Sequence, residues 1–125
     1  MKRLLVDTHA LLWWLMNDPS LSPTGRAEMA APANEVLVST ASIWEIAVKR
    51  SRGRLTVPEP LLEVIEREGF TWLPVSAAHA WAVSELPLHH RDPFDRLLVV
   101  QAQIEDVAIV TADPHFDAYD VSTSW

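Results

Sequence analysis

The sequence has no cysteine, no long apolar run and little positive charge, and each shortage excludes a class of protein. Without cysteine there is no disulfide framework and no thiolate zinc site, which suits a reducing cytoplasm, where we expect the protein to reside. The longest apolar run, residues 10–16, is far too short to span a bilayer. Only three apolar residues follow Met1, Lys2 and Arg3, so we expect no signal peptide and no membrane partner.

Positive charge is scarce but unevenly distributed. The net charge of −7 argues against a protein that binds nucleic acid by bulk electrostatics. Residues 105–125 contain five acids and no Lys or Arg. Four of the ten basic residues gather in one short segment, namely Lys49, Arg50, Arg52 and Arg54. A local basic patch is therefore still compatible with phosphate binding, above all beside a metal that offsets the acids.

Apolar runs and helix-like stretches alternate along the chain. At 125 residues and 49% apolar content, the sequence fits one folded domain over residues 1–125 and excludes a disordered chain. The expected strands are residues 3–6, 36–38, 70–73, 107–110 and, with a weaker pattern, 119–122. The expected helices are residues 8–16, 23–31, 40–52, 58–68, 77–86 and 94–105. This order predicts an α/β fold of three layers, with a central parallel sheet and helices on both faces.

Four carboxylates are spread along this pattern. Asp7 follows the first strand, Asp113 follows the strand at 107–110, and Asp95 opens the last helix; Glu45 lies within the helix at 40–52. The carboxyl ends of parallel strands line one crevice, so side chains remote in sequence meet there. Crowded carboxylates repel each other unless a cation neutralises them, and Mg²⁺ prefers oxygen ligands. The pattern predicts a metal site that handles phosphate.

Each of these acids also has a simpler interpretation, because Asp is a preferred helix cap. Asp7 could cap the first helix, and Asp113 could start a turn. Asp92 and Asp95 together resemble a capping box.

Glu45 has two interpretations as well. On a helical wheel, the inward stripe of its helix consists of Ile43, Ile46 and Ala47. The opposite side consists of Ser42, Glu45, Lys49 and Arg52. That side is either a solvated face with a Glu45–Lys49 pair or a wall of the crevice, with Glu45 as a metal ligand and the cations facing phosphate.

Four segments resemble the PIN-domain ribonucleases, most closely the VapC-type toxins of type II toxin–antitoxin pairs. They are LVDTHALLW (residues 5–13), SIWEI (42–46), DPFDRLL (92–98) and VTAD (110–113). The similarity covers essentially the whole chain, with the motifs in the family's order and spacing. It implies a PIN-like fold and an endoribonuclease that depends on Mg²⁺ or Mn²⁺.

The resemblance also assigns roles. Asp7, Glu45 and Asp95 match the family's acidic triad and Asp113 its fourth acid, so these four are expected to bind metal and act in catalysis. Thr111 matches a supporting hydroxyl residue. Asp92 either reaches the metal through water or only caps its helix. At His9 many relatives carry a small hydroxyl residue, so this position departs from the pattern. Metal-assisted attack of water would leave 5′-phosphate and 3′-hydroxyl ends.

The expected partners are RNA, a cognate VapB-type antitoxin and a second copy of the chain. Lys49, Arg52, Arg91 and Arg96 are the expected RNA contacts. For the first two, a favourable interaction with the helix C-terminus is the alternative. Trp13 and Trp14 are expected to project outward and bind the antitoxin. Alternatively, the helix at 23–31 or a homodimer covers them.

Other classes of protein share the acidic pattern. A haloacid-dehalogenase-like phosphatase needs a second aspartate where His9 stands, and a receiver-like domain needs an acidic pair after the first strand. A flap-type deoxyribonuclease normally needs a longer chain. A non-catalytic interaction module, whose acids only cap helices, would bind no Mn²⁺ saturably.

Overall fold

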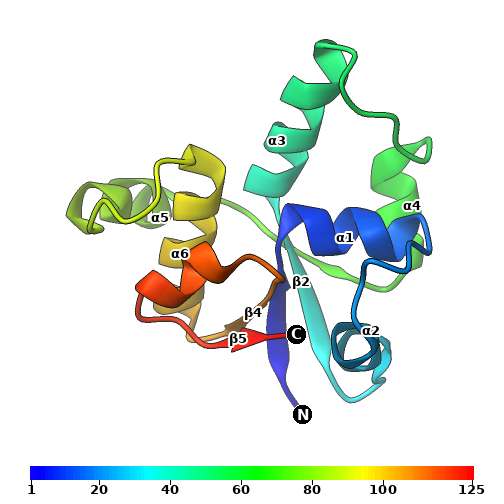
Figure 1. Ribbon diagram of the computed structural model, residues 1–125, viewed down its shortest axis with the longest axis horizontal. Coiled ribbons are helices and arrows are strands. Elements are labelled where there is room, and N and C mark those ends of the chain that lie inside the picture. The colour runs from blue at the N-terminus through cyan, green and yellow to red at the C-terminus, as the bar shows by residue number, and fades with distance from the viewer.

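A computed structural model describes residues 1–125 and shows one five-stranded sheet, in which every strand is parallel to its neighbours. The strands are β1 (Arg3–Val6), β2 (Glu35–Ser39), β3 (Thr71–Leu73), β4 (Ala108–Val110) and β5 (Thr123–Ser124). Their order in the sheet is β3-β2-β1-β4-β5, which places β1 at the centre (Figure 1). The predicted fold class, an α/β fold with a central parallel sheet, is confirmed.

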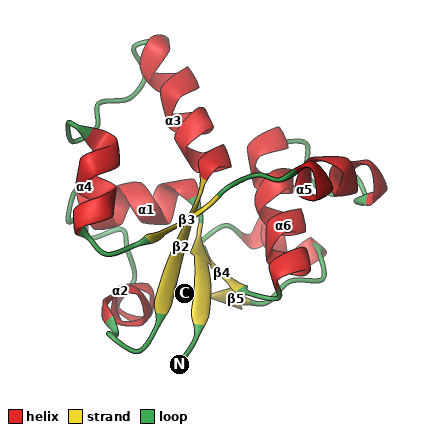
Figure 2. Cartoon of the chain, turned by 180° about the vertical axis from the view of Figure 1, so that it is seen from behind, coloured by secondary structure: helices red, strands yellow, loops and turns green.

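Helices pack on both faces of this sheet (Figure 2). They are α1 (Thr8–Leu15), α2 (Pro23–Ala30), α3 (Thr40–Ser51), α4 (Leu61–Arg67), α5 (Ala77–Ala82) and α6 (Pro93–Glu105), with 3₁₀ helices η1 (Val83–Glu85) and η2 (Pro114–Ala118). No helix has the length and apolar character needed to cross a membrane.

The side chains of β1 divide the hydrophobic core into two clusters. Leu4 and Val6 belong to a cluster shared with α1, α2 and α4, whereas Leu5 faces the cluster built on α6 and η2. This alternation follows from the two-residue period of a strand. Because β2 and β4 lie on opposite sides of β1, the chain crosses over in opposite directions there. In open parallel sheets, the crevice at the carboxyl ends of such strands is where ligands bind.

Three predicted elements have boundaries that differ from the structure by more than one residue. The last strand is Thr123–Ser124 rather than 119–122, because Tyr119 is buried in the core and its hydroxyl accepts a hydrogen bond from the His90 N–H. Helix α4 begins at Leu61 rather than 58, with Pro60 as the residue before it. Helix α5 ends at Ala82 and continues as the tighter turn η1.

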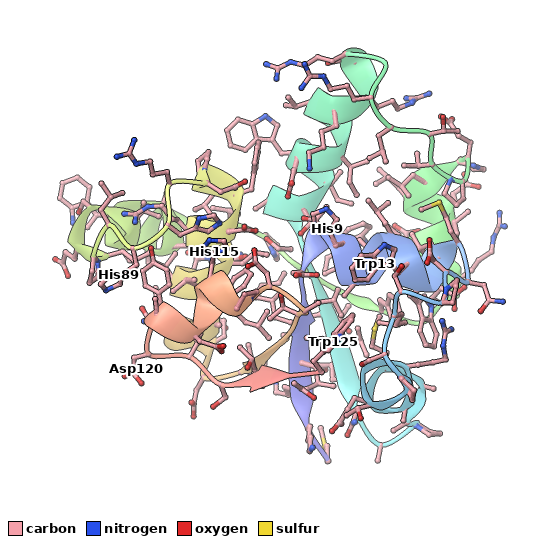
Figure 3. All side chains as sticks on the ribbon, in the orientation of Figure 1. His9, Trp13, His89, His115, Asp120 and Trp125 are labelled. Atoms are coloured by element: carbon pink, nitrogen blue, oxygen red, sulfur yellow. The ribbon has the colours of Figure 1, made fainter.

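The predicted outward projection of Trp13 and Trp14 is wrong. Both side chains are partly buried against the core cluster around α1. Trp13 packs on Trp125, with ring centroids 5.7 Å apart (Figure 3), and Trp14 packs on Phe70 at 5.8 Å. The guanidinium of Arg26, from α2, lies 6.0 Å from the Trp14 ring. Residues from distant parts of the chain thus cover part of this face, in partial agreement with the alternative that α2 covers it.

Candidate metal centre

Asp7 and Thr111 join the ends of the two central strands. Asp7 directly follows β1, where its Oδ1 accepts a hydrogen bond from Ala10 N at 2.7 Å and so caps α1. Its other oxygen, Oδ2, accepts a hydrogen bond from the Thr111 hydroxyl at 2.5 Å. Both residues are buried. Asp7 therefore caps α1 and also presents a fixed carboxylate to the crevice. The pairing of β1 with β4 brings Thr111 within hydrogen-bond distance of it.

Glu45 lies on the crevice side of α3 and is only 4% exposed, so the solvated-face interpretation is wrong. Its Oε1 accepts a hydrogen bond from the Thr8 hydroxyl at 2.7 Å. Its Oε2 pairs with Lys49 Nζ at 2.8 Å, as the i,i+4 spacing predicts. The inward face of α3 also differs from the predicted stripe, because Ser42 is buried whereas Ala47 is exposed.

Asp92 and Asp95 stand at the start of α6. Asp92 caps the helix, since its Oδ1 accepts hydrogen bonds from the backbone N–H groups of Phe94 (2.8 Å) and Asp95 (3.0 Å). The carboxylate of Asp95 points instead to His90, whose Nε2 lies 2.9 Å from Asp95 Oδ2. Of the two acids, Asp95 is the one turned into the crevice, and Asp92 fulfils the capping role expected of it.

Asp113 is the fourth acid and lies directly before η2. Its N–H donates a hydrogen bond to Thr111 Oγ1 at 2.9 Å, and its Oδ1 accepts one from the backbone N–H of His115. The His115 ring lies beside the same oxygen, with Nδ1 at 2.7 Å. Burial acts to raise the pKa of Asp113, but these His115 contacts outweigh it and leave that pKa below its ordinary value.

Burial disfavours the charged form of the two innermost aspartates. Desolvation raises the pKa of Asp7, and the hydrogen bonds from Thr111 and Ala10 offset this only in part. Desolvation also raises the pKa of Asp95 to about 6, helped by the negative charges of Asp92 and Glu45 and opposed by His90. The negative charge of Glu45 acts on Asp95, so these two side chains lie near each other. The negative charge of Asp113 likewise raises the pKa of Asp7.

The raised pKa of Asp95 predicts a pH-dependent stability of the metal-free protein. Between pH 3.8, its ordinary value, and about 6, the unfolded chain has released a proton that the folded chain retains. Stability therefore falls as pH rises through this window. We expect Asp95→Asn to remove this loss. At pH 7 its free energy of unfolding should exceed that of the wild type by on the order of 2 kcal/mol, and at pH 4 the two proteins should be equally stable.

Urea denaturation at both pH values, in a chelating buffer, measures this difference. Asp117→Asn, at an exposed acid of η2, makes the same change in charge and should follow the wild type at both. An Asp95→Asn advantage of equal size at pH 4 and pH 7 would contradict the prediction.

The donor set at the crevice fits a hard divalent cation. Asp7 is buried without a basic side chain in salt-bridge contact, so its charge has no direct counter-ion. All four acids offer carboxylate oxygens, which Mg²⁺ and Mn²⁺ accept. One ligand atom each from His90, Asp92 and Asp95 lies within 4.8 Å of the others. The residues that could hold the ion are the charge-coupled acids, Asp7 with Asp113 and Asp95 with Glu45.

A basic groove runs beside Glu45, and we define it by Lys49, Arg52 and Arg54. These side chains line a cavity of about 400 Å³ together with His9, Glu45 and Phe94. Arg50 points elsewhere and pairs with Glu59. Two of the predicted RNA contacts, Lys49 and Arg52, therefore open onto a space shared with a candidate metal ligand, while the predicted contact Arg91 is exposed.

Arg96, the fourth predicted RNA contact, has a different role. Its guanidinium donates hydrogen bonds to the carbonyl oxygens of Val83, Leu86, Pro87 and His90, at 2.9–3.3 Å, and to the Tyr119 hydroxyl. These bonds engage both terminal nitrogens and leave them no free donor for phosphate. Arg96 instead ties the loop before α6 to the helix.

Sequence reasoning gives three contributors no role in the metal site, although His90 stands among the basic residues around Asp95. His90 and His115 flank Asp95 and Asp113, and their rings stack with centroids 4.7 Å apart. Thr8 orients Glu45. The only available signal was proximity in sequence, since each lies within five residues of an acid.

The family model described as PIN domain matches residues 4–122. A search of the curated proteins found no match.

Three solved structures share the fold at low sequence identity. VapBC2 from Rickettsia felis bound to a DNA fragment from its promoter is 15% identical, with a TM-score of 0.68, and the match covers 97% of this chain and 96% of that one. DNA-bound VapBC from Salmonella typhimurium is 15% identical, with a TM-score of 0.68 and coverages of 98% and 97%. FitAcB from Neisseria gonorrhoeae is 16% identical, with a TM-score of 0.57 and coverages of 96% and 95%.

Proposed function

Because this chain belongs to the PIN domain family, whose model matches nearly its whole length, we propose that residues 1–125 form a single PIN domain acting as a metal-dependent endoribonuclease toxin. One observation carries the proposal. Four acids at the crevice form two pairs whose charges influence each other, Asp7 with Asp113 and Asp95 with Glu45, and burial raises the pKa of one member of each pair. A group that only capped helices would not need Glu45 in the interior of α3 to face that crevice.

The chain's own residues prepare the site for hydrolysis of a phosphodiester. Thr111 and Thr8 fix the carboxylates of Asp7 and Glu45, so that these ligands need little reorganisation. Mg²⁺ or Mn²⁺ bound there supplies positive charge that offsets the charge developing on the phosphate. Asp95, with a pKa of about 6, is suited to accept a proton from the attacking water. Attack by water leaves a 5′-phosphate and a 3′-hydroxyl.

Lys49, Arg52 and Arg91 are the residues that we propose bind the RNA backbone. The first two line the basic groove next to Glu45, so a strand lying in it would reach the acids. In a chain with a net charge of −7, such a local groove is the kind of surface that can attract phosphate.

This proposal predicts a measurable salt dependence. Each phosphate contact on a single strand contributes about −0.7 to the slope of log K against log salt. We expect Lys49→Gln combined with Arg52→Gln to make the slope shallower by about 1.4 for RNA binding measured in EDTA. The control pair Arg50→Gln and Arg67→Gln removes two charges that pair with Glu59 and Glu63 outside the groove. Equal slopes in the two double variants would reassign Lys49 and Arg52 to the end of α3.

A VapB-type antitoxin is the proposed protein partner, supported by the shared fold of the VapBC complexes. With Trp13 and Trp14 partly covered, a better-exposed place for its peptide is the groove between α3 and α4, a cavity of about 430 Å³ lined mainly by apolar residues. Ile43 and Ala47 line one side of it and Leu61 and Leu62 the other. A homodimer of the chain is also proposed.

The test of the function is cleavage of total cellular RNA by the purified protein with Mg²⁺, Mn²⁺ or EDTA, followed by mapping of the new ends. We expect metal-dependent cuts at a limited set of sites, with ligatable 5′-phosphates. Cleavage that persists in EDTA, or cleavage of single-stranded DNA alone, would overturn the proposal.

A further inference from the structure

Two histidines connect the acid at the start of α6 with the acid at the start of η2. His90 contacts Asp95 at 2.9 Å and His115 contacts Asp113 at 2.7 Å. Their rings stack almost in parallel, with an angle of 10° between the planes. Single ligand atoms of His90, Asp113 and His115 lie within 4.8 Å of one another. Two ring nitrogens and a carboxylate oxygen thus surround a common point at the rim of the crevice.

This donor set differs in kind from the set around Asp7 and Glu45. Imidazole nitrogen suits Zn²⁺, Ni²⁺ and Cu²⁺, whereas Mg²⁺ favours carboxylate, carbonyl and water oxygens. Two histidines, one carboxylate and an open fourth position form a common tetrahedral arrangement for Zn²⁺.

The geometry needs only a small adjustment to bind such an ion. Bonds of about 2.0–2.2 Å place tetrahedral ligand atoms roughly 3.3 Å apart, so ligand atoms that now lie within 4.8 Å of one another must approach by at most about 1.5 Å. The His115 side chain is 61% exposed, so its ring can turn without disturbing the core. The backbone of His90 is held by Arg96 and Tyr119, which fixes the other side of the site.

We propose that His90, Asp113 and His115 form a second cation site, selective for Zn²⁺ over Mg²⁺, and that Zn²⁺ bound there inhibits the nuclease. Inhibition follows because the ion would withdraw Asp113 from the acidic group and His90 from Asp95. The inhibitory part rests on the proposed function, whereas the binding part does not.

Calorimetric titration of the metal-free protein with Zn²⁺, in millimolar Mg²⁺, tests the binding. Co²⁺ serves as a second probe, because its absorption spectrum reports nitrogen ligands and tetrahedral geometry. We expect His115→Ala to weaken Zn²⁺ at least about 10-fold, since even loss of an indirect ligand contact costs about 10–100-fold. His90→Ala should do the same. His89→Ala, at an exposed histidine of the same loop that is outside the group, should leave the affinity within about twofold.

The inhibition is measured as the Zn²⁺ concentration that halves each variant's own Mg²⁺-dependent cleavage rate. We expect this concentration to rise at least about 10-fold in His115→Ala and to stay unchanged in His89→Ala. Unaltered Zn²⁺ affinity in the His90→Ala, His115→Ala double variant would overturn the site. Loss of Zn²⁺ binding in Asp7→Asn but not in His115→Ala would overturn it too, by placing the ion among the acids. If the wild type shows no cleavage, the proposed function fails while the binding titration still decides the Zn²⁺ site.

Discussion

Asp7→Asn and Glu45→Gln are each expected to lower metal-dependent RNA cleavage at least about 1000-fold, because a bound cation contributes several kcal/mol to transition-state stabilisation. Both substitutions remove one negative charge from the crevice and keep one oxygen. The amide oxygen at position 7 can still accept the hydrogen bond from Ala10 N that begins α1. At position 45, the amide oxygen can still accept the hydrogen bond from Thr8.

The fold should survive these substitutions. Because burial raises the pKa of Asp7, its ionised form destabilises the metal-free protein at neutral pH, and we expect Asp7→Asn to melt no lower than the wild type. Added Mn²⁺ should raise the melting temperature of the wild type but not of Asp7→Asn. Asp117→Asn is the control that keeps full cleavage. Retained cleavage in both site variants, or loss of the folded circular-dichroism spectrum, would remove the acids from the mechanism.

Arg96→Ala is expected to reduce the free energy of unfolding by about 2–4 kcal/mol, a large effect for a polar residue. The substitution leaves four carbonyl oxygens and the Tyr119 hydroxyl without their charged donor. It also frees the loop that presents His90 to Asp95, so metal affinity should fall with stability. Urea denaturation measures the first effect and Mn²⁺ titration the second.

Arg91 provides a matched comparison, since it lies in the same loop, is exposed and makes no hydrogen bond through its side chain. Arg91→Ala should change stability by less than about 0.5 kcal/mol. If Arg96→Ala is as stable as Arg91→Ala but makes the salt dependence of RNA binding shallower, Arg96 contacts the substrate after all.

Much of the architecture could be predicted from local signals. Element boundaries are marked by the apolar run before Asp7, by the cap-and-proline pair Ser22–Pro23 and by the glycines after α3 and α4. The regular alternation of strands and helices then predicts a parallel sheet. The convergence of Asp7 and Asp113 follows as well, because both stand just after neighbouring parallel strands.

What could not be predicted depends on contacts between distant segments. The sequence predicts that Trp13 lies on the surface because nothing in its own helix covers it. The residue that packs on it, Trp125, comes at the other end of the chain. The carbonyl partners of Arg96 are set by the path of an irregular loop, which no periodicity encodes. His90 and His115 meet only because η2 folds back toward the start of α6.

Under the proposed function, three of the acids both cap a helix and serve the metal site, so activity can be lost without loss of the fold. Asp7, Asp92 and Asp113 each receive a backbone hydrogen bond at the start of a helix, a task that asparagine performs about as well as aspartate. Exchange of a single carboxylate oxygen for an amide nitrogen at Asp7 would therefore give an inert protein of nearly identical shape. A lineage carrying this gene has a short path, one nucleotide change from an Asp codon to an Asn codon, to a silent copy that still presents the same outer surface to whatever binds it.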